Sequence, residues 1–207
     1  MDQEELKRRI DIVANLCAGI LPEKEVFFLV SIQYSSERSL AAFNRYDNTE
    51  IIEDNSAKLV SLIQEAIGHA AALSRYFFPS EHSPRYVKEM KLVRMARAKK
   101  LREAFSINES SPIFNRELRN AWEHFDEIMD YYLLENEAGY FFPTPMLGEH
   151  TLADVPEGKI FKLLDVENKC LVILGKKYFF ESIRSEVERI YNLAIKMDQN
   201  GGRLNLL

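Results

Sequence analysis

The chain has few of the residues from which metal and phosphate sites are usually built. Its 207 residues include 8 glycines, and none of them forms a glycine-rich phosphate loop. The four histidines include no pair spaced four residues apart, and no Glu-x-x-His sequence occurs. The two cysteines, Cys17 and Cys170, lie far apart and are expected to be reduced thiols. We therefore expect a protein that works without a metal or another cofactor.

Long apolar runs are also missing. The longest uninterrupted apolar run is about five residues, far below what a membrane span needs. The first residues, MDQEELKRR, are charged and lack the apolar core of a signal peptide. With 46% hydrophobic and 29% charged residues, the composition is typical of a globular protein. We expect a cytoplasmic protein with no membrane partner and a single domain over residues 1–207.

Apolar residues recur at helical spacing over most of the chain. This spacing, together with helix start and stop residues, predicts helices over residues 2–18, 26–46, 56–78, 85–105 and 111–137. The aromatic and proline-rich segment GYFFPTP follows the last of these. We expect it, over residues 139–145, to be irregular.

The C-terminal part has a different pattern. Two β-prone runs, residues 159–166 and 170–174, flank a polar turn and predict a β-hairpin. A last helix is expected over residues 180–197. The predicted fold class is therefore mainly α, an antiparallel helical bundle. Its helical core covers residues 1–145, and the hairpin and final helix form an appendage over residues 146–207.

Residues 111–137 are the segment on which the functional interpretation depends. Large apolar residues recur along it at steps of three and four, at Leu118, Trp122, Phe125, Met129 and Tyr132. Arg119, Asn120 and His124 fall on the opposite arc, because successive residues lie about 100° apart around a helix. We therefore expect these three polar side chains to face outward from a helix that aromatic residues anchor.

The sequence RNAWEH at residues 119–124 resembles the R-x4-6-H motif of the HEPN superfamily, in which a polar residue often follows the arginine. Arg75 and His82 also match this spacing, but Pro79 lies between them and would end a helix. The resemblance implies an all-helical dimer. Many members of the superfamily are metal-independent ribonucleases of toxin–antitoxin and anti-phage systems, and others only bind or scaffold. The implied partners are a second copy of the chain, an RNA substrate and an antitoxin protein.

These residue types suit RNA cleavage without a metal, which needs a base, an acid and positive charge beside the phosphorane. His124 can accept or supply a proton, since histidine titrates near neutral pH. Arg119 can stabilise the phosphorane oxygens, and Asn120 can orient the phosphate or the histidine. One chain offers one such histidine, so a two-fold dimer would complete the site. The expected products carry a cyclic phosphate and a 5′-hydroxyl.

A basic segment precedes the motif, although the whole chain has a net charge of −5. Residues 85–102 hold eight basic residues and one acidic residue. Such a segment can guide a phosphate backbone. Its candidate RNA contacts are Lys91, Arg94, Arg97, Lys99 and Lys100. Six of the basic residues recur at every third position, which winds them around a helix, so a solvated helix with locally paired charges is an equal alternative.

Other interpretations of the motif remain open. Arg119 and Glu123 are four residues apart, a spacing that favours a helical ion pair beside a solvated histidine. Carboxylates follow closely, at Asp126, Glu127 and Asp130, and oppose tight binding of RNA. The sequence is therefore also compatible with a non-catalytic dimeric binding or scaffold protein, and with a helical protein that binds a small ligand.

Overall fold

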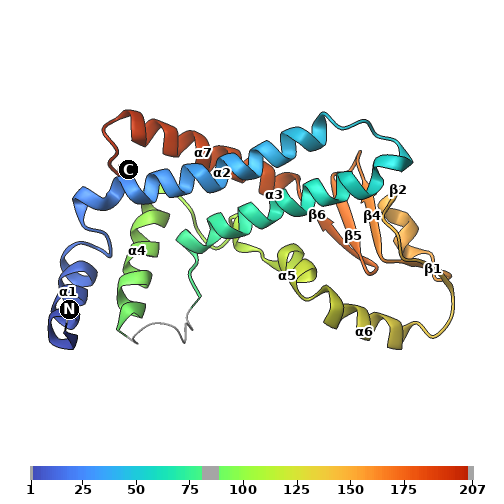
Figure 1. The fold of residues 1–207 in the computed structure, drawn as a ribbon, viewed down its shortest axis with the longest axis horizontal. Helices are drawn as coiled ribbons and strands as arrows, with labels where there is room; N and C mark the ends of the chain where they lie inside the picture. The colour runs from blue at the N-terminus through green and yellow to red at the C-terminus, as the bar shows by residue number, and fades with distance from the viewer. Residues whose placement is uncertain (1, 81–88, 205–207) are drawn as a thin grey trace. The chain divides into compact units, whose positions relative to one another are not determined.

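A computed structural model describes residues 2–80 and 89–204 of the chain (Figure 1). In this part the helices are α1 (Gln3–Asp11), α2 (Glu25–Asp47), α3 (Ser56–Phe77), α4 (Met90–Phe105), α5 (Glu117–Glu123), α6 (Phe125–Glu135) and α7 (Glu181–Gln199). The predicted helices that correspond to α2, α3 and α7 are confirmed. The helix predicted over residues 85–105 is confirmed from Met90 onward. Its first residues, together with His82, lie outside the described residues.

The contacts between Cα atoms divide the chain into two compact units. The first unit comprises residues 1–37, 70–114 and 187–207, and the second comprises residues 38–69 and 115–186. The unit boundaries fall inside α2, α3 and α7, whereas the sequence analysis places a division at residue 145. The mainly helical character, the strands near the C-terminus and the final helix are confirmed. The antiparallel bundle of the HEPN superfamily stays a prediction.

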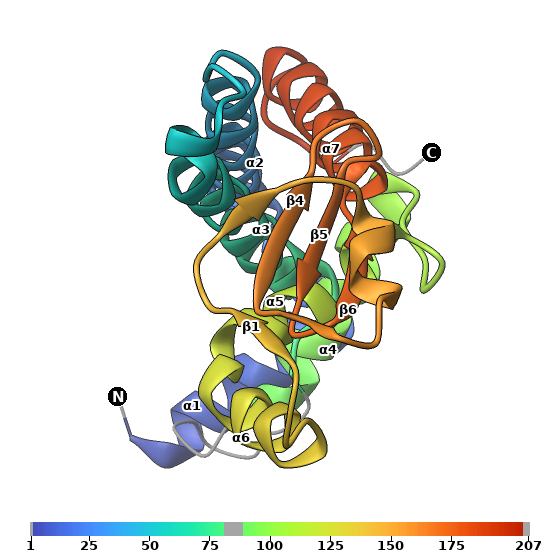
Figure 2. The same ribbon diagram turned by 90° about the vertical axis from the view of Figure 1, so that its right-hand side faces the viewer.

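The second unit contains a mixed β-sheet (Figure 2). Its strands lie in the order β2 (Met146–Leu147), β4 (Lys162–Asp165), β5 (Cys170–Ile173) and β6 (Lys176–Phe179). The strands β4 and β5 pair antiparallel, with Asp165 opposite Cys170, and this confirms the predicted hairpin. The last strand, β6, pairs antiparallel with β5 and lies outside any predicted strand, whereas β2 runs parallel to β4.

A separate parallel ladder joins β1 (Tyr140–Phe142) to β3 (Gly158–Ile160). The expectation of irregular structure over residues 139–145 is therefore wrong for the first part of that segment. Its backbone groups find partners in a strand that follows only after the 3-10 turn at His150–Asp154. A partner so far along the chain leaves no signal in the local pattern.

Aromatic and aliphatic side chains form the core of the second unit. Phe180 stacks on Phe43, with ring centroids 6.2 Å apart, and meets the edge of Tyr46 at 6.1 Å. Aliphatic side chains of α3, β4 and β5 complete this cluster. Leu118 and Ala121 are buried in the same cluster. Apolar packing therefore fixes the position of α5, the helix that carries Arg119 and Asn120.

The first unit contains two close contacts that restrict its geometry. Gly19 has a φ of +84°, and a Cβ at this position would lie 2.0 Å from the backbone nitrogen of Arg97. Only glycine fits there. Glu25 is buried at the start of α2, where its Oε1 lies 2.7 Å from Lys100 Nζ and its Oε2 accepts a hydrogen bond of 3.0 Å from the backbone N–H of Leu204.

The helix predicted over residues 2–18 is only partly α-helical. Asp2 caps α1, because its Oδ1 accepts a hydrogen bond of 2.8 Å from the N–H of Glu5. The α-helix ends at Asp11 and continues as a π-helical turn at Ile12–Leu16.

Within residues 2–80 and 89–204, every helix is too short or too polar to cross a lipid bilayer.

Candidate functional site

The predicted single helix over residues 111–137 is wrong, because the chain is interrupted twice. Pro112–Phe114 forms a 3-10 turn, and the chain then re-enters a helix where Asn115 Oδ1 accepts a hydrogen bond of 2.8 Å from the N–H of Glu117. The second interruption is His124, whose φ of −113° and ψ of 30° separate α5 from α6. Backbone hydrogen bonds continue on both sides of His124, so the chain bends there without opening.

The predicted apolar stripe is confirmed on both sides of this bend. Leu118 and Ala121 are buried, and the larger members of the stripe, Trp122, Phe125, Met129 and Tyr132, are partly buried against the same core. The ammonium of Lys162 lies 4.3 Å from the ring centroid of Phe125 and 5.7 Å from that of Trp122. These contacts hold the bend against the second unit's core.

Arg119 is more buried than the sequence analysis expects. Its side chain is 23% exposed, so the prediction that it faces outward is wrong. One guanidinium nitrogen, Nη1, donates a hydrogen bond of 3.0 Å to Asn120 Oδ1, and Nη2 forms an ion pair with the Glu123 carboxylate. Its Nε is buried and has no hydrogen-bond partner among the described residues. The guanidinium is therefore held between the residue that follows it and the carboxylate one turn later.

His124 is available to solvent. Its side chain is 53% exposed, and its Nδ1 lies 3.4 Å from Glu127 Oε1. The structure thus brings Arg119 and Asn120 into contact and places His124 at the end of the same helix. The carboxylates that are near His124 in sequence are exposed, at Glu123, Asp126, Glu127 and Asp130.

The five basic residues of α4 that the sequence analysis selects differ in their surroundings. Lys100 is 11% exposed and pairs with Glu25, which removes it from the predicted RNA-binding surface. Lys99 is exposed and lies 3.9 Å from Glu103. The Nε atoms of Arg94 and Arg97 are buried without a partner among the described residues, and Lys91 is exposed. The burial of Arg94 and Arg97 follows from the recurrence of basic residues at every third position, which turns some of these side chains toward the interior of the first unit.

An Asp–His pair that the sequence analysis missed lies in the sheet of the second unit. Asp165 is 3% exposed, and its Oδ2 lies 2.7 Å from His150 Nδ1 and accepts a hydrogen bond of 2.9 Å from the His150 N–H. The N–H and side-chain amide of Asn168 donate two further hydrogen bonds of 2.9 Å. Burial raises the pKa of Asp165, but these hydrogen bonds outweigh it and hold the pKa well below its usual range.

This pair has a structural role. His150 begins the 3-10 turn before β3, and its ring meets the edge of the Phe179 ring at 5.5 Å. Asp165 is the last residue of β4, and Asn168 lies in the turn that leads to β5. The buried carboxylate therefore ties two connections of the sheet together. The spacing of Asp165 and Asn168 is a turn signal that sequence reasoning could have used, whereas nothing in the sequence marks His150 as their partner.

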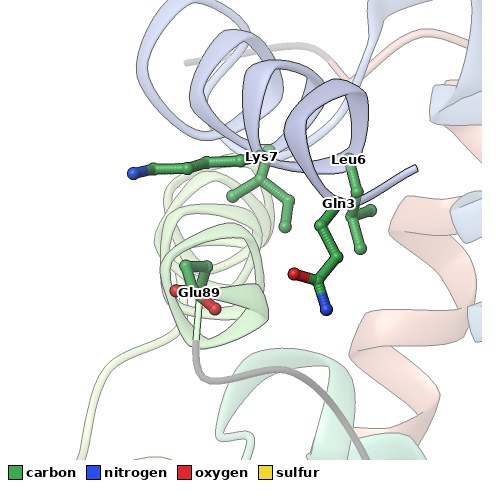
Figure 3. A pocket seen from close by; sticks show the side chains of 5 residues that line it. Gln3, Leu6, Lys7 and Glu89 are labelled. Atoms are coloured by element: carbon green, nitrogen blue, oxygen red, sulfur yellow. The ribbon is translucent and has the colours of Figure 1, made fainter. Parts of the chain in front are cut away.

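The first unit has hollows that a small ligand could enter. One of about 290 Å³ lies between α1 and the start of α4, and its lining includes Gln3, Leu6, Lys7 and Glu89. Figure 3 shows that the ammonium of Lys7 points away from the Gln3 amide, so the polar groups of this hollow do not converge. A second, of about 300 Å³, lies between α2, α3 and α4 and is lined by arginine and tyrosine side chains.

Comparison of the chain with protein-family models, with curated proteins and with solved structures finds no match. In the part of the chain that the structure describes, no group of three or more His, Cys, Asp and Glu side chains is gathered as a metal ion would need. The interpretation of the site therefore depends on the geometry of Arg119, Asn120 and His124.

Proposed function

We propose that the protein is a dimeric, metal-independent endoribonuclease whose site is formed by Arg119, Asn120 and His124. The contact between Arg119 Nη1 and Asn120 Oδ1, on the same short helix that ends at the exposed His124, supports this proposal most strongly. A permanent positive charge and a proton-transfer group thus lie within one turn and a half of chain. In the context that the HEPN resemblance implies, the protein acts as a toxin or anti-phage component that an antitoxin partner restrains.

In the proposed reaction the 2′-oxygen of the RNA attacks the adjacent phosphorus, and its proton passes to one His124 imidazole. The bond to the 5′-oxygen then breaks, and that oxygen takes a proton from the imidazolium of the second copy's His124. Arg119 stabilises the charge of the phosphorane once a phosphate oxygen displaces the Glu123 carboxylate from the guanidinium. Asn120 keeps the guanidinium oriented through its Oδ1.

The dimer in this proposal forms through α6. This helix has no fully buried residue, although it follows His124 directly. Tyr131 and Leu134 are 73% and 76% exposed, and the aromatic strand β1 that follows α6 is exposed as well. Apolar side chains so exposed favour association, because burying them removes apolar surface from water. A second copy seated on α6 would bring the two His124 residues near the same symmetry axis.

The proposal predicts RNA cleavage that persists in excess EDTA. The purified protein should cut single-stranded RNA into products with 2′,3′-cyclic phosphate and 5′-hydroxyl ends, because no step uses a metal. Gel analysis and mass spectrometry of the products measure this, and an Arg119→Ala preparation made in parallel controls for contaminating nuclease. Cleavage that EDTA abolishes, or that Arg119→Ala retains in full with its fold intact, would contradict the proposal.

A second prediction concerns the dimer. Leu134→Lys should weaken dimerisation about tenfold or more, since it removes apolar contact area and places a charge in the interface. Analytical ultracentrifugation over a range of concentrations measures this change. Leu16→Lys is the matched control, because Leu16 is 79% exposed and belongs to the first unit. Equal dimerisation of both variants would show that α6 is not the interface.

The ion pair between Arg119 and Glu123 favours a second candidate function, that of a non-catalytic dimeric binding protein. In that case Arg119 stabilises α5 and never meets a phosphate. Glu123→Gln separates the two candidates, because it frees the guanidinium while keeping the shape of the side chain. Faster cleavage in this variant supports the ribonuclease. Absence of cleavage in both the natural chain and the variant, with an unchanged fold, supports the binding protein.

A further inference from the structure

The hollow of about 300 Å³ in the first unit has a lining that suits an anion. Arg75 and Tyr76 come from α3, Arg97 comes from α4, and Ser35 comes from α2. Two arginines and two residues with hydroxyl groups, from three helices, therefore line one opening. Among the described residues that line the hollow, none is acidic.

The arginines of this hollow are not neutralised by other described residues. Arg97 places its guanidinium carbon 5.3 Å from the centroid of the Phe28 ring, which holds the group from one side, while its Nε is buried without a hydrogen-bond partner. The Nε of Arg94, one turn earlier on α4, is also buried without a hydrogen-bond partner among the described residues. No carboxylate of the described residues pairs with Arg75, Arg94 or Arg97. Unsatisfied buried donors of this kind are uncommon in folded proteins. The charges of Arg75 and Arg97, which line the hollow, therefore lack a counter-charge that a bound anion would supply.

The direction of the pKa shift of Arg97 agrees with an anion site in this hollow. Burial lowers the pKa of Arg97, and the neighbouring charge of Arg94 lowers it further, against an opposing effect of Tyr76. An anion in the hollow would offset the desolvation of the guanidinium and return the pKa toward its usual range. Phosphate is the anion that best matches a planar guanidinium, because it accepts two parallel hydrogen bonds from it.

We propose that the hollow lined by Ser35, Arg75, Tyr76 and Arg97 is a binding site for a phosphate group, carried either by a small phosphate ester or by the backbone of an RNA. The arginines would bind the phosphate oxygens, and the hydroxyl groups would donate hydrogen bonds to the oxygens that remain. The site belongs to the first unit and does not depend on Arg119, Asn120 or His124. The inference therefore holds whether or not the protein cleaves RNA.

Isothermal titration calorimetry at low ionic strength tests the site with three probes: inorganic phosphate, uridine 5′-monophosphate and a uridine oligonucleotide without a terminal phosphate. Arg75→Gln should weaken binding about tenfold or more, since it removes a charge-assisted hydrogen bond. Arg75 is exposed, so this variant should retain its fold, and circular dichroism checks that it does. Lys58→Gln is the control, because it removes the same charge from an exposed position on α3 outside the hollow and should change the affinity less than twofold.

The pattern of binding identifies the source of the phosphate. Binding of inorganic phosphate and the mononucleotide, weakened in Arg75→Gln alone, supports a site for a small phosphate ester. Binding of the oligonucleotide alone, with the same difference between variants, supports a site for the RNA backbone. Failure of all three probes to bind, or equal affinities of Arg75→Gln and Lys58→Gln, would overturn the proposal.

Discussion

Replacement of His124 with alanine is expected to lower the rate of RNA cleavage by about 10²–10⁴-fold, the range that a general acid or base contributes. The fold should not change, because the His124 side chain is 53% exposed and its Nδ1 lies beside Glu127 on the surface of α6. Single-turnover cleavage in EDTA measures the rate, and thermal unfolding of the same sample measures the stability. The effect is large because each dimer loses both its acid and its base in one substitution.

His69→Ala is the matched control for this experiment. His69 is a half-buried histidine of α3 in the second unit and belongs to no part of the proposed site. It should keep the cleavage rate within a few-fold of the natural chain. A His124→Ala variant that cleaves as fast as His69→Ala would exclude His124 as a catalytic residue and leave the binding protein as the better proposal.

Replacement of Asp165 with alanine is expected to lower the free energy of unfolding by about 3 kcal/mol or more, since hydrogen bonds to a charged group contribute roughly 1.5–3 kcal/mol each and their donors would be left buried. His150 and Asn168 lose their partner together. Urea unfolding of the two proteins measures the difference. Asp154→Ala is the control, because Asp154 pairs with Lys177 at the surface, where its side chain is 65% exposed, and an exposed pair contributes about 1 kcal/mol or less.

The same carboxylate gives the stability a pH dependence of known sign. The pKa of Asp165 is lowered in the folded protein, so the group stabilises the fold fully at pH values above its unfolded pKa of about 3.9. This stabilisation is lost as the pH falls below that value. The natural chain should therefore lose stability more steeply than Asp165→Ala as the pH falls from about 4 to about 2. Parallel slopes in this range would contradict the strong hydrogen bonding of the carboxylate.

The helices were predictable from the sequence where burial is one-sided and continuous. α3 is an example, because its buried apolar residues repeat every three or four positions along the whole helix. The bend at His124 was not predictable, since neither glycine nor proline marks it and the stripe continues on both sides. The strands β1 and β6 were missed for another reason. Short strands carry little local signal, and the partner of β1 lies beyond the 3-10 turn at His150–Asp154.

The sequence was sufficient to select the residues of the candidate site but not to predict their burial or contacts. The motif at residues 119–124 names Arg119, Asn120 and His124, and the structure places the first two in contact. The partial burial of Arg119 could not be read from the helical arc, because the arc gives the position of a residue on its own helix and not which other parts of the chain cover it. The Lys100–Glu25 pair was hidden for a similar reason, since the two residues are far apart in sequence.

Glu25 connects the start of α2 to Leu204, near the C-terminal end of the described residues. Its carboxylate satisfies both Lys100 and the backbone N–H of Leu204 inside the first unit. A protease that cut after Gly202 would leave one oxygen of a buried charge without its donor, although it would remove nothing from α2 itself. Removal of the residues after Gly202, a kind of truncation that many proteins tolerate, should therefore destabilise the first turn of α2.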